Sequence, residues 1–137
     1  MKDTGVGLML VLLLPVAGAL AEGSQLSVST GPAAPATVAV LTPREAWKKI
    51  DQGALLVDVR SAAETAGGML PGALNVPHTR IQEYLYEFGP DKNRTIVLYC
   101  RSGRRSELAR SELEVLGYTN VLNGGSYPEL VAEMKRR

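Results

Sequence analysis

The sequence predicts an α/β domain built on a parallel sheet, and three observations support this prediction. Apolar, strand-like runs alternate with helical patterns along the chain, which is the order that crossover units require. The runs Leu55–Val57 and Ile96–Tyr99 are continuously apolar, as expected of strands covered on both faces. Aromatic residues make up only 5% of the chain, so the core must be mainly aliphatic.

Strands are expected wherever a short apolar run is bounded by turn residues. These runs are Val38–Leu41, Ala54–Val59, Ala73–Val76, Thr95–Tyr99 and Asn120–Leu122.

Helices are expected between the strands, and several have sequence signals at their ends. Thr42-Pro43-Arg44-Glu45 is a capping box with proline at the first helical position, and it predicts a helix that ends at Gly53 and carries Trp47 in the core. A second helix is predicted from Gly103 to Leu116, with Ala109, Leu113 and Leu116 on its inner face. Gly117 is expected to end this helix in a left-handed backbone conformation. Two more are predicted at Ile81–Phe88 and from Pro128 to the terminus.

The first 36 residues differ in kind from the rest. Lys2, the apolar run Leu8–Leu14 and Ala19-Leu20-Ala21 are typical of a signal peptide over residues 1–21, since the apolar run is shorter than the ~20 residues of a membrane span. Cleavage after Ala21 would make Glu22 the first residue of the mature protein. The alternative is that the segment is retained as a membrane anchor. Residues 22–36 are predicted to be a flexible linker, and residues 37–137 a single domain. The expected location is periplasmic or secreted.

The overall charge argues against large anionic partners. Fifteen basic and fourteen acidic side chains leave a formal net charge of +1, so no nucleic-acid partner is expected. After signal cleavage we expect a monomer that does not associate with a membrane.

Cys100 is the only cysteine of the chain, so it cannot form an internal disulfide in an oxidising compartment. It is therefore either a buried apolar filler or a thiol kept for its reactivity. With one Cys and one His, a metal site of the usual Cys/His type is not expected.

The residues around Cys100 favour the reactive thiol. Cys100 follows a predicted strand and precedes Arg101, Ser102, Gly103, Arg104 and Arg105, after which a helix is expected. This order puts Cys100 at the carboxyl end of a parallel strand, facing loop N–H groups and the positive end of a helix dipole. Each effect favours the thiolate and lowers a cysteine pKa from ~8.5 to about 3.5–7.5 in comparable settings. The arginines also predict an anionic ligand.

The loop and three further motifs resemble the single-domain rhodanese family. The loop reads Cys-Arg-Ser-Gly-Arg-Arg-Ser, and the other motifs are Leu56-Val57-Asp58-Val59-Arg60 with Glu64 after it, Pro71–Pro77, and Leu122-Asn123-Gly124-Gly125. The resemblance covers about residues 37–137 and implies a three-layer fold, with a five-stranded parallel sheet and helices on both faces. One departure is that the family often has Trp shortly after the paired glycines, where this chain offers only Tyr127.

The resemblance also implies a reaction. The thiolate of Cys100 would attack the outer sulfur of a donor such as thiosulfate and form a persulfide, which an acceptor such as cyanide or a thiol would discharge. Loop N–H groups from Arg101 to Arg105, including those of Ser102 and Gly103, would cradle the persulfide, and the side chains of Arg101, Arg104 and Arg105 would attract the donor. No cofactor and no metal is implied.

Three residues outside the loop have open or lesser roles. Asp58 is expected to be structural, holding loop backbone or an arginine. Arg60 either pairs with Glu64 or forms a wall of the pocket. His78 is expected to be a solvated surface residue and not part of a Cys-His dyad.

Two alternative functions remain open at this stage. A cysteine phosphatase or arsenate reductase of related fold uses a Cys-x5-Arg loop, whereas Arg105 makes this loop Cys-x4-Arg, a smaller ring that suits a single sulfur atom better. The other alternative is a non-catalytic binding module or passive persulfide carrier. Such modules usually lack the cysteine that this chain retains.

Overall fold

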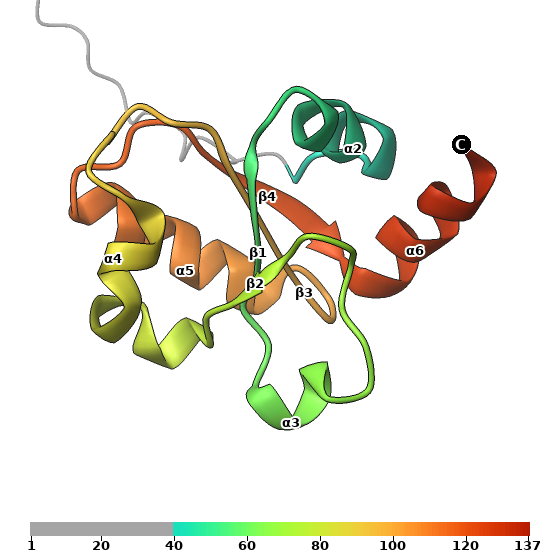
Figure 1. Ribbon diagram of the computed structural model, residues 1–137, viewed down its shortest axis with the longest axis horizontal. Helices are drawn as coiled ribbons and strands as arrows, with labels where there is room; N and C mark the ends of the chain where they lie inside the picture. The colour runs from blue at the N-terminus through green and yellow to red at the C-terminus, as the bar shows by residue number, and fades with distance from the viewer. Residues whose placement is uncertain (1–39) are drawn as a thin grey trace, which may run out of the picture. The chain divides into compact units, whose positions relative to one another are not determined.

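A parallel sheet of four strands forms the centre of the computed structural model, which describes residues 40–137 (Figure 1). The strands lie in the order β2-β1-β3-β4, and each neighbouring pair is parallel. One of the two inner strands, β3, is buried at every position. The bounds are β1 Leu55–Asp58, β2 Leu74–Asn75, β3 Ile96–Cys100 and β4 Val121–Ser126.

Helical segments connect the consecutive strands, as parallel pairing requires. One α-helix precedes the sheet and another follows it. The helices and 3₁₀ turns (η) are α2 Pro43–Asp51, α3 Ala62–Thr65, η3 His78–Arg80, η4 Gln82–Tyr84, α4 Leu85–Phe88, α5 Arg104–Val115 and α6 Tyr127–Arg136.

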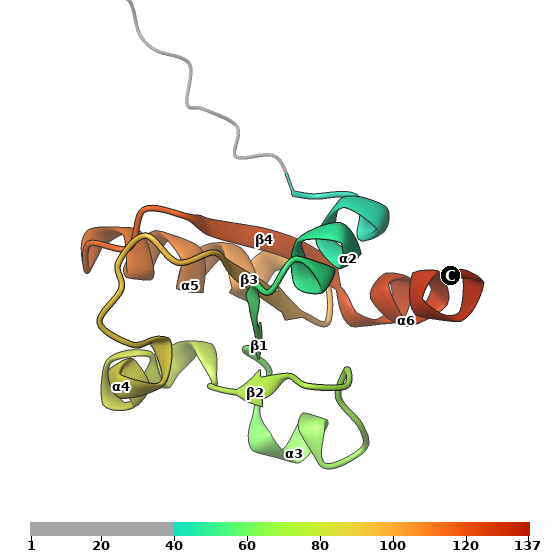
Figure 2. The same cartoon turned by 45° about the horizontal axis from the view of Figure 1, so that its top comes forward.

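Side chains of β3 alternate between the two faces of the sheet. Ile96, Leu98 and Cys100 join a core cluster with α4 and α5, whereas Val97 and Tyr99 join a second cluster with α2 and α6. Figures 1 and 2 both show α4 to the left of β1, and α2 and α6 to its right. The predicted three-layer α/β architecture is confirmed.

Four of the five predicted strands are present, and β4 is longer than expected. The sheet therefore has four strands within residues 40–137, and not the five that the resemblance implied. Of the fifth predicted strand, Val38–Leu41, the first two residues lie outside the described residues, as do the predicted signal peptide and linker, and Val40 and Leu41 are described but lie in no strand. The Leu41 N–H donates to the Asn123 carbonyl at 2.9 Å, which is a main-chain contact alongside β4. A fifth strand there stays a prediction.

Helix ends agree with the sequence where capping residues determine them. Both halves of the Thr42 and Glu45 capping box are formed, with Glu45 N–H donating to the Thr42 hydroxyl at 3.2 Å. Trp47 is in the core, and its indole N–H donates to the Leu130 carbonyl at 2.9 Å. Gly117 follows α5 with φ of +101°. These predictions are confirmed.

Two short segments differ from the sequence-based expectation. The single helix predicted over Ile81–Phe88 is wrong, because Tyr84 leaves the helical region (φ −110°, ψ 22°) and separates η4 from α4. The helix α3 was not predicted at all. Its capping box of Ser61 and Glu64 is visible in the sequence, but four residues are too few to show an apolar period.

A β-bulge at Gly124 and Gly125 changes the pairing of β4 with β3 beside Cys100. The register shifts between Leu98 and Cys100, and Gly125 has φ of +90°, a conformation that favours glycine. The bulge brings the end of β4 next to the end of β3.

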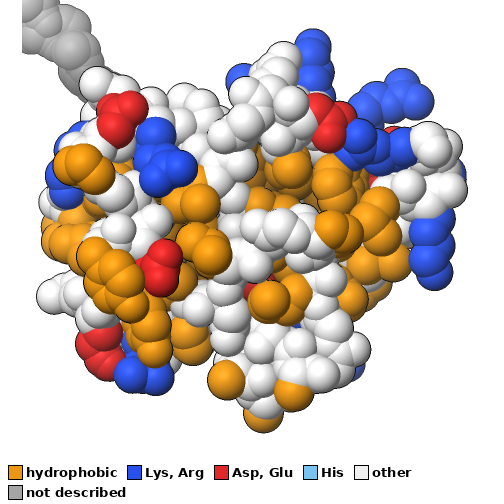
Figure 3. Space-filling view, viewed as in Figure 1, with side chains coloured by type: hydrophobic (Ala, Val, Ile, Leu, Met, Phe, Trp, Pro, Cys, Tyr) orange, Lys and Arg blue, Asp and Glu red, His pale blue; other side chains and the backbone are white. Residues whose placement is uncertain are grey.

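The surface of the sheet-flanking helices mixes charges of both signs. Figure 3 shows Lys and Arg side chains gathered near α2 and α6, where Arg44 and Arg136 both pair with Glu133, and Arg137 pairs with Asp51. This group of basic residues therefore forms no uninterrupted cationic surface. No helix within residues 40–137 is long and apolar enough to cross a membrane.

Gly124→Ala is expected to lower the free energy of unfolding by about 1–3 kcal/mol. An added Cβ would lie 2.8 Å from Cγ1 of Val97 and 3.1 Å from the Leu98 carbonyl oxygen, and both groups belong to the buried strand β3. Urea unfolding followed by circular dichroism measures the change. Gly67→Ala is the matched control, because its Cβ would meet only an ordinary contact at 3.6 Å. If Gly124→Ala and Gly67→Ala unfolded with the same free energy, the predicted steric clash at Gly124 would be wrong.

Candidate active site

Cys100 ends β3 at the carboxyl edge of the sheet, where parallel strands present ligand sites. Its Sγ accepts a hydrogen bond from the backbone N–H of Gly103 at 2.9 Å, and the Ser106 hydroxyl lies 3.7 Å away. The residue is fully buried. The sulfur is thus enclosed by the loop that follows it and by the first turn of α5.

These surroundings make Cys100 more acidic than an ordinary thiol. Burial raises the pKa of the thiol, but the backbone N–H groups of Ser106, Ser102 and Gly103 and the Ser106 hydroxyl lower it by more, so the net pKa lies below its usual value. A cysteine that only fills an apolar core has a raised pKa. The buried-filler alternative is therefore disfavoured.

Gly103 allows the chain to turn from β3 into α5. It is the N-cap of α5 with φ of +95°, a left-handed conformation that costs other residues roughly 1–2 kcal/mol. A Cβ at Gly103 would lie 3.4 Å from the Cα of Gly125, so the loop packs directly against the bulge of β4.

The three loop arginines do not have equivalent surroundings. Arg101 and Arg104 are exposed, and neither forms an ion pair with any residue from 40 to 137. Arg105 is half-buried and binds both carboxylate oxygens of Glu64, at 2.7 and 2.8 Å. The expectation that Arg105 attracts the donor stays a prediction, and the charge of Arg105 is paired with that of Glu64 in this structure.

Asp58 and Arg60 form a buried ion pair at the end of β1, the strand next to β3. The distance between Arg60 Nη2 and Asp58 Oδ2 is 2.7 Å, and the side chains are 8% and 0% exposed. The Arg60 guanidinium also donates to the Gly68 carbonyl at 2.7 Å and lies 4.2 Å from the centroid of the Tyr127 ring. Asp58 holds an arginine, as expected, but the alternative in which Arg60 pairs with Glu64 is wrong.

Ser106 and Asn123 join the loop to β4, and the sequence did not single out either as a site residue. The Ser106 hydroxyl lies 2.7 Å from Asn123 Oδ1, and the Asn123 amide donates to the Gly103 carbonyl at 2.9 Å. Asn123 Oδ1 also accepts the Gly125 N–H at 2.9 Å. One buried side chain thus binds the loop, α5 and the bulge together. The sequence motif Leu122-Asn123-Gly124-Gly125 includes Asn123, but the motif alone does not reveal that Asn123 contacts Gly103 and Ser106.

His78 does not contribute to the thiol site. It is half-buried and begins η3, not a surface loop as expected, and its backbone N–H donates to the Val59 carbonyl at 3.0 Å. No hydrogen bond joins its imidazole to the Cys100 loop in the described structure. Residues 40–137 contain no group of three His, Cys, Asp or Glu side chains that could hold a metal ion.

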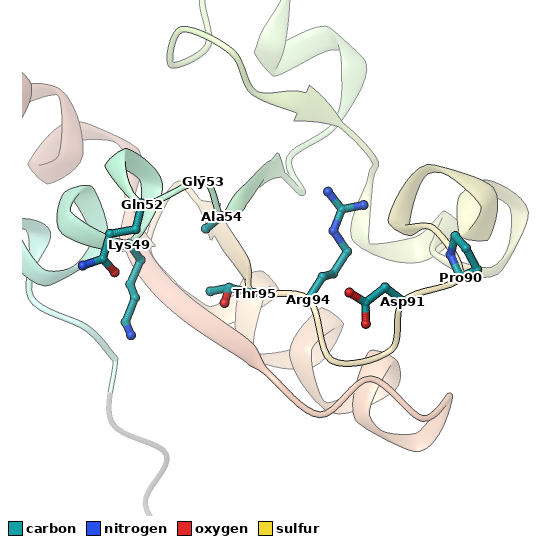
Figure 4. A pocket seen from close by; sticks show the side chains of 8 residues that line it. All are labelled: Lys49, Gln52, Gly53, Ala54, Pro90, Asp91, Arg94 and Thr95. Carbon is teal, nitrogen blue, oxygen red and sulfur yellow. The ribbon is translucent and has the colours of Figure 1, made fainter.

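A cleft lies at the opposite edge of the sheet (Figure 4). It is lined by Ala54 and Thr95, which precede β1 and β3, and by the basic side chains of Lys49 and Arg94 among others. None of the predicted site residues lines this cleft. Ligands of parallel sheets bind at the carboxyl ends of strands, so the candidate site is the Cys100 loop.

Residues 42–129 match the family model of the rhodanese-like domain. The chain belongs to the rhodanese-like family. The matched segment contains every strand of the sheet, the Cys100 loop and its contacts to Glu64 and Asn123. The rhodanese-like fold predicted from the motifs is therefore confirmed.

Similar rhodanese-like proteins include named sulfurtransferases. The thiosulfate sulfurtransferase PspE of Escherichia coli is 35% identical over 74 residues, which cover 54% of this chain and 71% of the relative. A sulfurtransferase of Allochromatium vinosum is 48% identical over 69 residues, covering 50% and 63%. The structure of a human single-domain sulfurtransferase is 28% identical with a TM-score of 0.59, and the match covers 69% of this chain and 96% of that one.

Alkylation of Cys100 by iodoacetamide should have its pH midpoint below that of the urea-unfolded protein. The pKa of the folded thiol is depressed, so the thiolate persists to lower pH in the folded state. The linked stability is present above the unfolded pKa and is lost as pH falls through the folded pKa. Because the chain has one cysteine, the unfolded protein is its own control. The comparison uses the pH midpoint of alkylation and not its absolute rate, because burial of Cys100 slows the reaction in the folded protein. A folded midpoint at or above the unfolded one would refute the assigned acidity.

Proposed function

We propose that this rhodanese-like chain is a sulfurtransferase in which Cys100 carries one sulfur atom as a persulfide, between a donor such as thiosulfate and an acceptor nucleophile. The observation that carries the proposal is the 2.9 Å hydrogen bond from the Gly103 N–H to the Cys100 sulfur, at the carboxyl end of β3. A thiol stabilised as its anion in this way is a strong nucleophile. The named activity of the relatives is of the same class.

The reaction consists of two displacements at sulfur. The Cys100 thiolate attacks the outer sulfur of thiosulfate; a new S–S bond forms while the S–S bond of the donor breaks, and its electron pair leaves with sulfite. Cyanide or a thiol then attacks the outer sulfur of the persulfide, and the electron pair returns to Cys100 as thiolate. The reaction as proposed requires no metal or organic cofactor.

The loop backbone and two arginines have separate tasks in this scheme. The N–H groups of Ser102 and Gly103, which already lower the pKa of Cys100, would stabilise the persulfide anion in the same way. The exposed side chains of Arg101 and Arg104 would attract the donor dianion. Since Cys100 has no exposed surface, the donor reaches the sulfur only after neighbouring side chains shift.

The pairing of Arg105 argues against the phosphatase alternative. A Cys-x5-Arg loop encloses phosphate with an arginine at the sixth position, which is Ser106 in this chain. Arg105, which precedes this position in the sequence, is paired with Glu64 and not free to enclose a phosphate. A passive persulfide carrier would share the first displacement and differ only in lacking turnover.

Incubation with thiosulfate should add the mass of one sulfur atom to the intact protein, and cyanide should remove it as thiocyanate. Cys100→Ser should abolish both steps, because a hydroxyl at neutral pH has neither the ionisation nor the sulfur affinity of the thiolate. Intact-protein mass spectrometry and a thiocyanate assay measure the two steps.

His78→Ala is the control and should keep nearly full turnover, because His78 lies outside the loop. A single round of thiocyanate release without further turnover would identify a carrier. Hydrolysis of aryl phosphates without any mass gain on Cys100 would overturn the proposal in favour of a phosphatase.

We also propose that the protein is exported and acts in the periplasm or outside the cell, on the strength of the apolar run Leu8–Leu14 followed by Ala19-Leu20-Ala21. Protein purified from its native host should begin at Glu22 by N-terminal sequencing. A membrane-extracted form that retains Met1 would show that the segment is not removed.

A further inference from the structure

We propose that Glu64 determines the anion affinity of the Cys100 loop: by occupying Arg105, it prevents the loop from holding oxyanions such as sulfate tightly. This inference rests on the proposed sulfur transfer for its purpose, although the binding that it predicts can be measured without any transfer. Glu64 is in this view a specificity-determining residue that acts through Arg105.

The contact between Glu64 and Arg105 has the geometry of an arginine that binds an oxyanion. Two guanidinium nitrogens face two carboxylate oxygens at 2.7 and 2.8 Å, which is the paired arrangement that arginine also uses for sulfate and phosphate groups. The Arg105 side chain is 28% exposed and the Glu64 side chain is 33% exposed. Glu64 therefore already occupies the face of Arg105 that an anionic ligand would use.

Glu64 is held in this position from its own side of the contact. Its Oε2 accepts hydrogen bonds from the Ser61 N–H at 3.1 Å and the Ser61 hydroxyl at 2.9 Å. The first of these, together with the Glu64 N–H that donates to the Ser61 hydroxyl at 3.2 Å, forms the α3 capping box. The hydrogen bonds from Arg105, followed by those from Ser61, hold the pKa of Glu64 far below its usual range. The carboxylate thus stays ionised and in place at neutral pH.

Arg105 lies close enough to the reacting sulfur for its pairing to affect ligands there. Arg105 lies in the loop segment between Gly103, whose N–H is 2.9 Å from the Cys100 sulfur, and Ser106, whose hydroxyl is 3.7 Å from it. The Cys100 thiolate also raises the pKa of Arg105, although less than the hydrogen bonds to Glu64 do. A dianion next to Cys100 would therefore meet Arg105 if Glu64 were absent. With Glu64 present, the dianion meets only Arg101 and Arg104, both exposed and without an ion-pair partner among residues 40–137.

The pairing of Arg105 with Glu64 affects the release of the product anion as much as the binding of the donor. Sulfate carries the same charge as thiosulfate, and the leaving sulfite is also an anion, so an arginine that bound the donor tightly would also retain the product and unreactive oxyanions. An exposed arginine exchanges its ligands readily because solvent screens the charge. The pairing of Arg105 with Glu64 therefore leaves Arg101 and Arg104 to attract dianions, while it prevents the loop from binding them tightly.

The substitution Glu64→Gln separates the charge of Glu64 from its structural role. Glutamine also completes a capping box, so α3 should keep its N-terminus while Arg105 loses its counter-ion. Glu83→Gln is the matched control, because Glu83 forms a similar two-oxygen contact with Arg80 on the exposed turn after β2.

The test is isothermal titration with inorganic sulfate. Glu64→Gln should bind sulfate at least about tenfold more tightly than the wild type, the effect of one charge-assisted contact, and Glu83→Gln should match the wild type. The double variant Glu64→Gln/Arg105→Gln should return to the wild-type affinity. In steady-state assays Glu64→Gln should also lower KM for thiosulfate while sulfate becomes an effective competitor.

Two results would overturn the inference. One is a Glu64→Gln affinity no greater than that of the wild type, and the other is a double variant that binds sulfate more weakly than the wild type, since Arg105 would then already serve as an anion ligand. The double variant keeps the test decisive if Glu64→Gln alone is unstable, because it removes both members of the pair. Sulfate binding is independent of the thiosulfate-dependent mass gain on Cys100, so failure of sulfur transfer and failure of this inference are distinguishable.

Discussion

The backbone N–H groups that face the sulfur of Cys100, including that of Gly103 at 2.9 Å, are the constraint on which the site depends, because a buried thiolate must find its hydrogen-bond donors in the protein. Cys100 is fully buried, and its pKa is nevertheless lowered. This is possible only while the backbone of the loop faces the sulfur. Any change that turned the backbone N–H groups of Ser106, Ser102 and Gly103 away from the sulfur would leave burial as the dominant effect and raise the pKa of the thiol.

The neighbouring strand holds the loop in the required conformation. Gly103 needs its left-handed φ to turn toward the sulfur, and its close approach to Gly125 needs the bulge of β4. Asn123 accepts from the Gly125 N–H and donates to the Gly103 carbonyl, so the bulge and the loop share one side chain. The last strand is therefore part of the site, although it supplies no group proposed to touch the substrate.

The sequence predicted the parts of the site that depend on local order. Cys100 at a strand end, the loop glycine and the helix after it follow from apolar runs and turn residues, and these are confirmed. The partner of Arg60 could not be predicted in this way. Its nearness in sequence to Glu64 suggested a local pair, but Arg60 folds back on Asp58, and Glu64 reaches Arg105, 41 residues away. The pairing of Glu64 with Arg105 depends on which strand ends are adjacent, and only the tertiary fold determines that; once Glu64 is paired there, the local partner left for Arg60 is Asp58.

The same tertiary pairing changes the meaning of a basic loop. The three arginines suggested one cluster of positive charge around the sulfur, yet only Arg101 and Arg104 remain without an ion-pair partner among the described residues. Arg105 instead pairs with Glu64, which joins α5 to α3 and neutralises the charge of Arg105. The proposed reaction, in which the loop binds one anion, releases another and keeps a thiolate, benefits from this division. Fixed positive charge beside the sulfur would favour every anion equally, whereas backbone N–H groups aimed at one atom favour the sulfur alone.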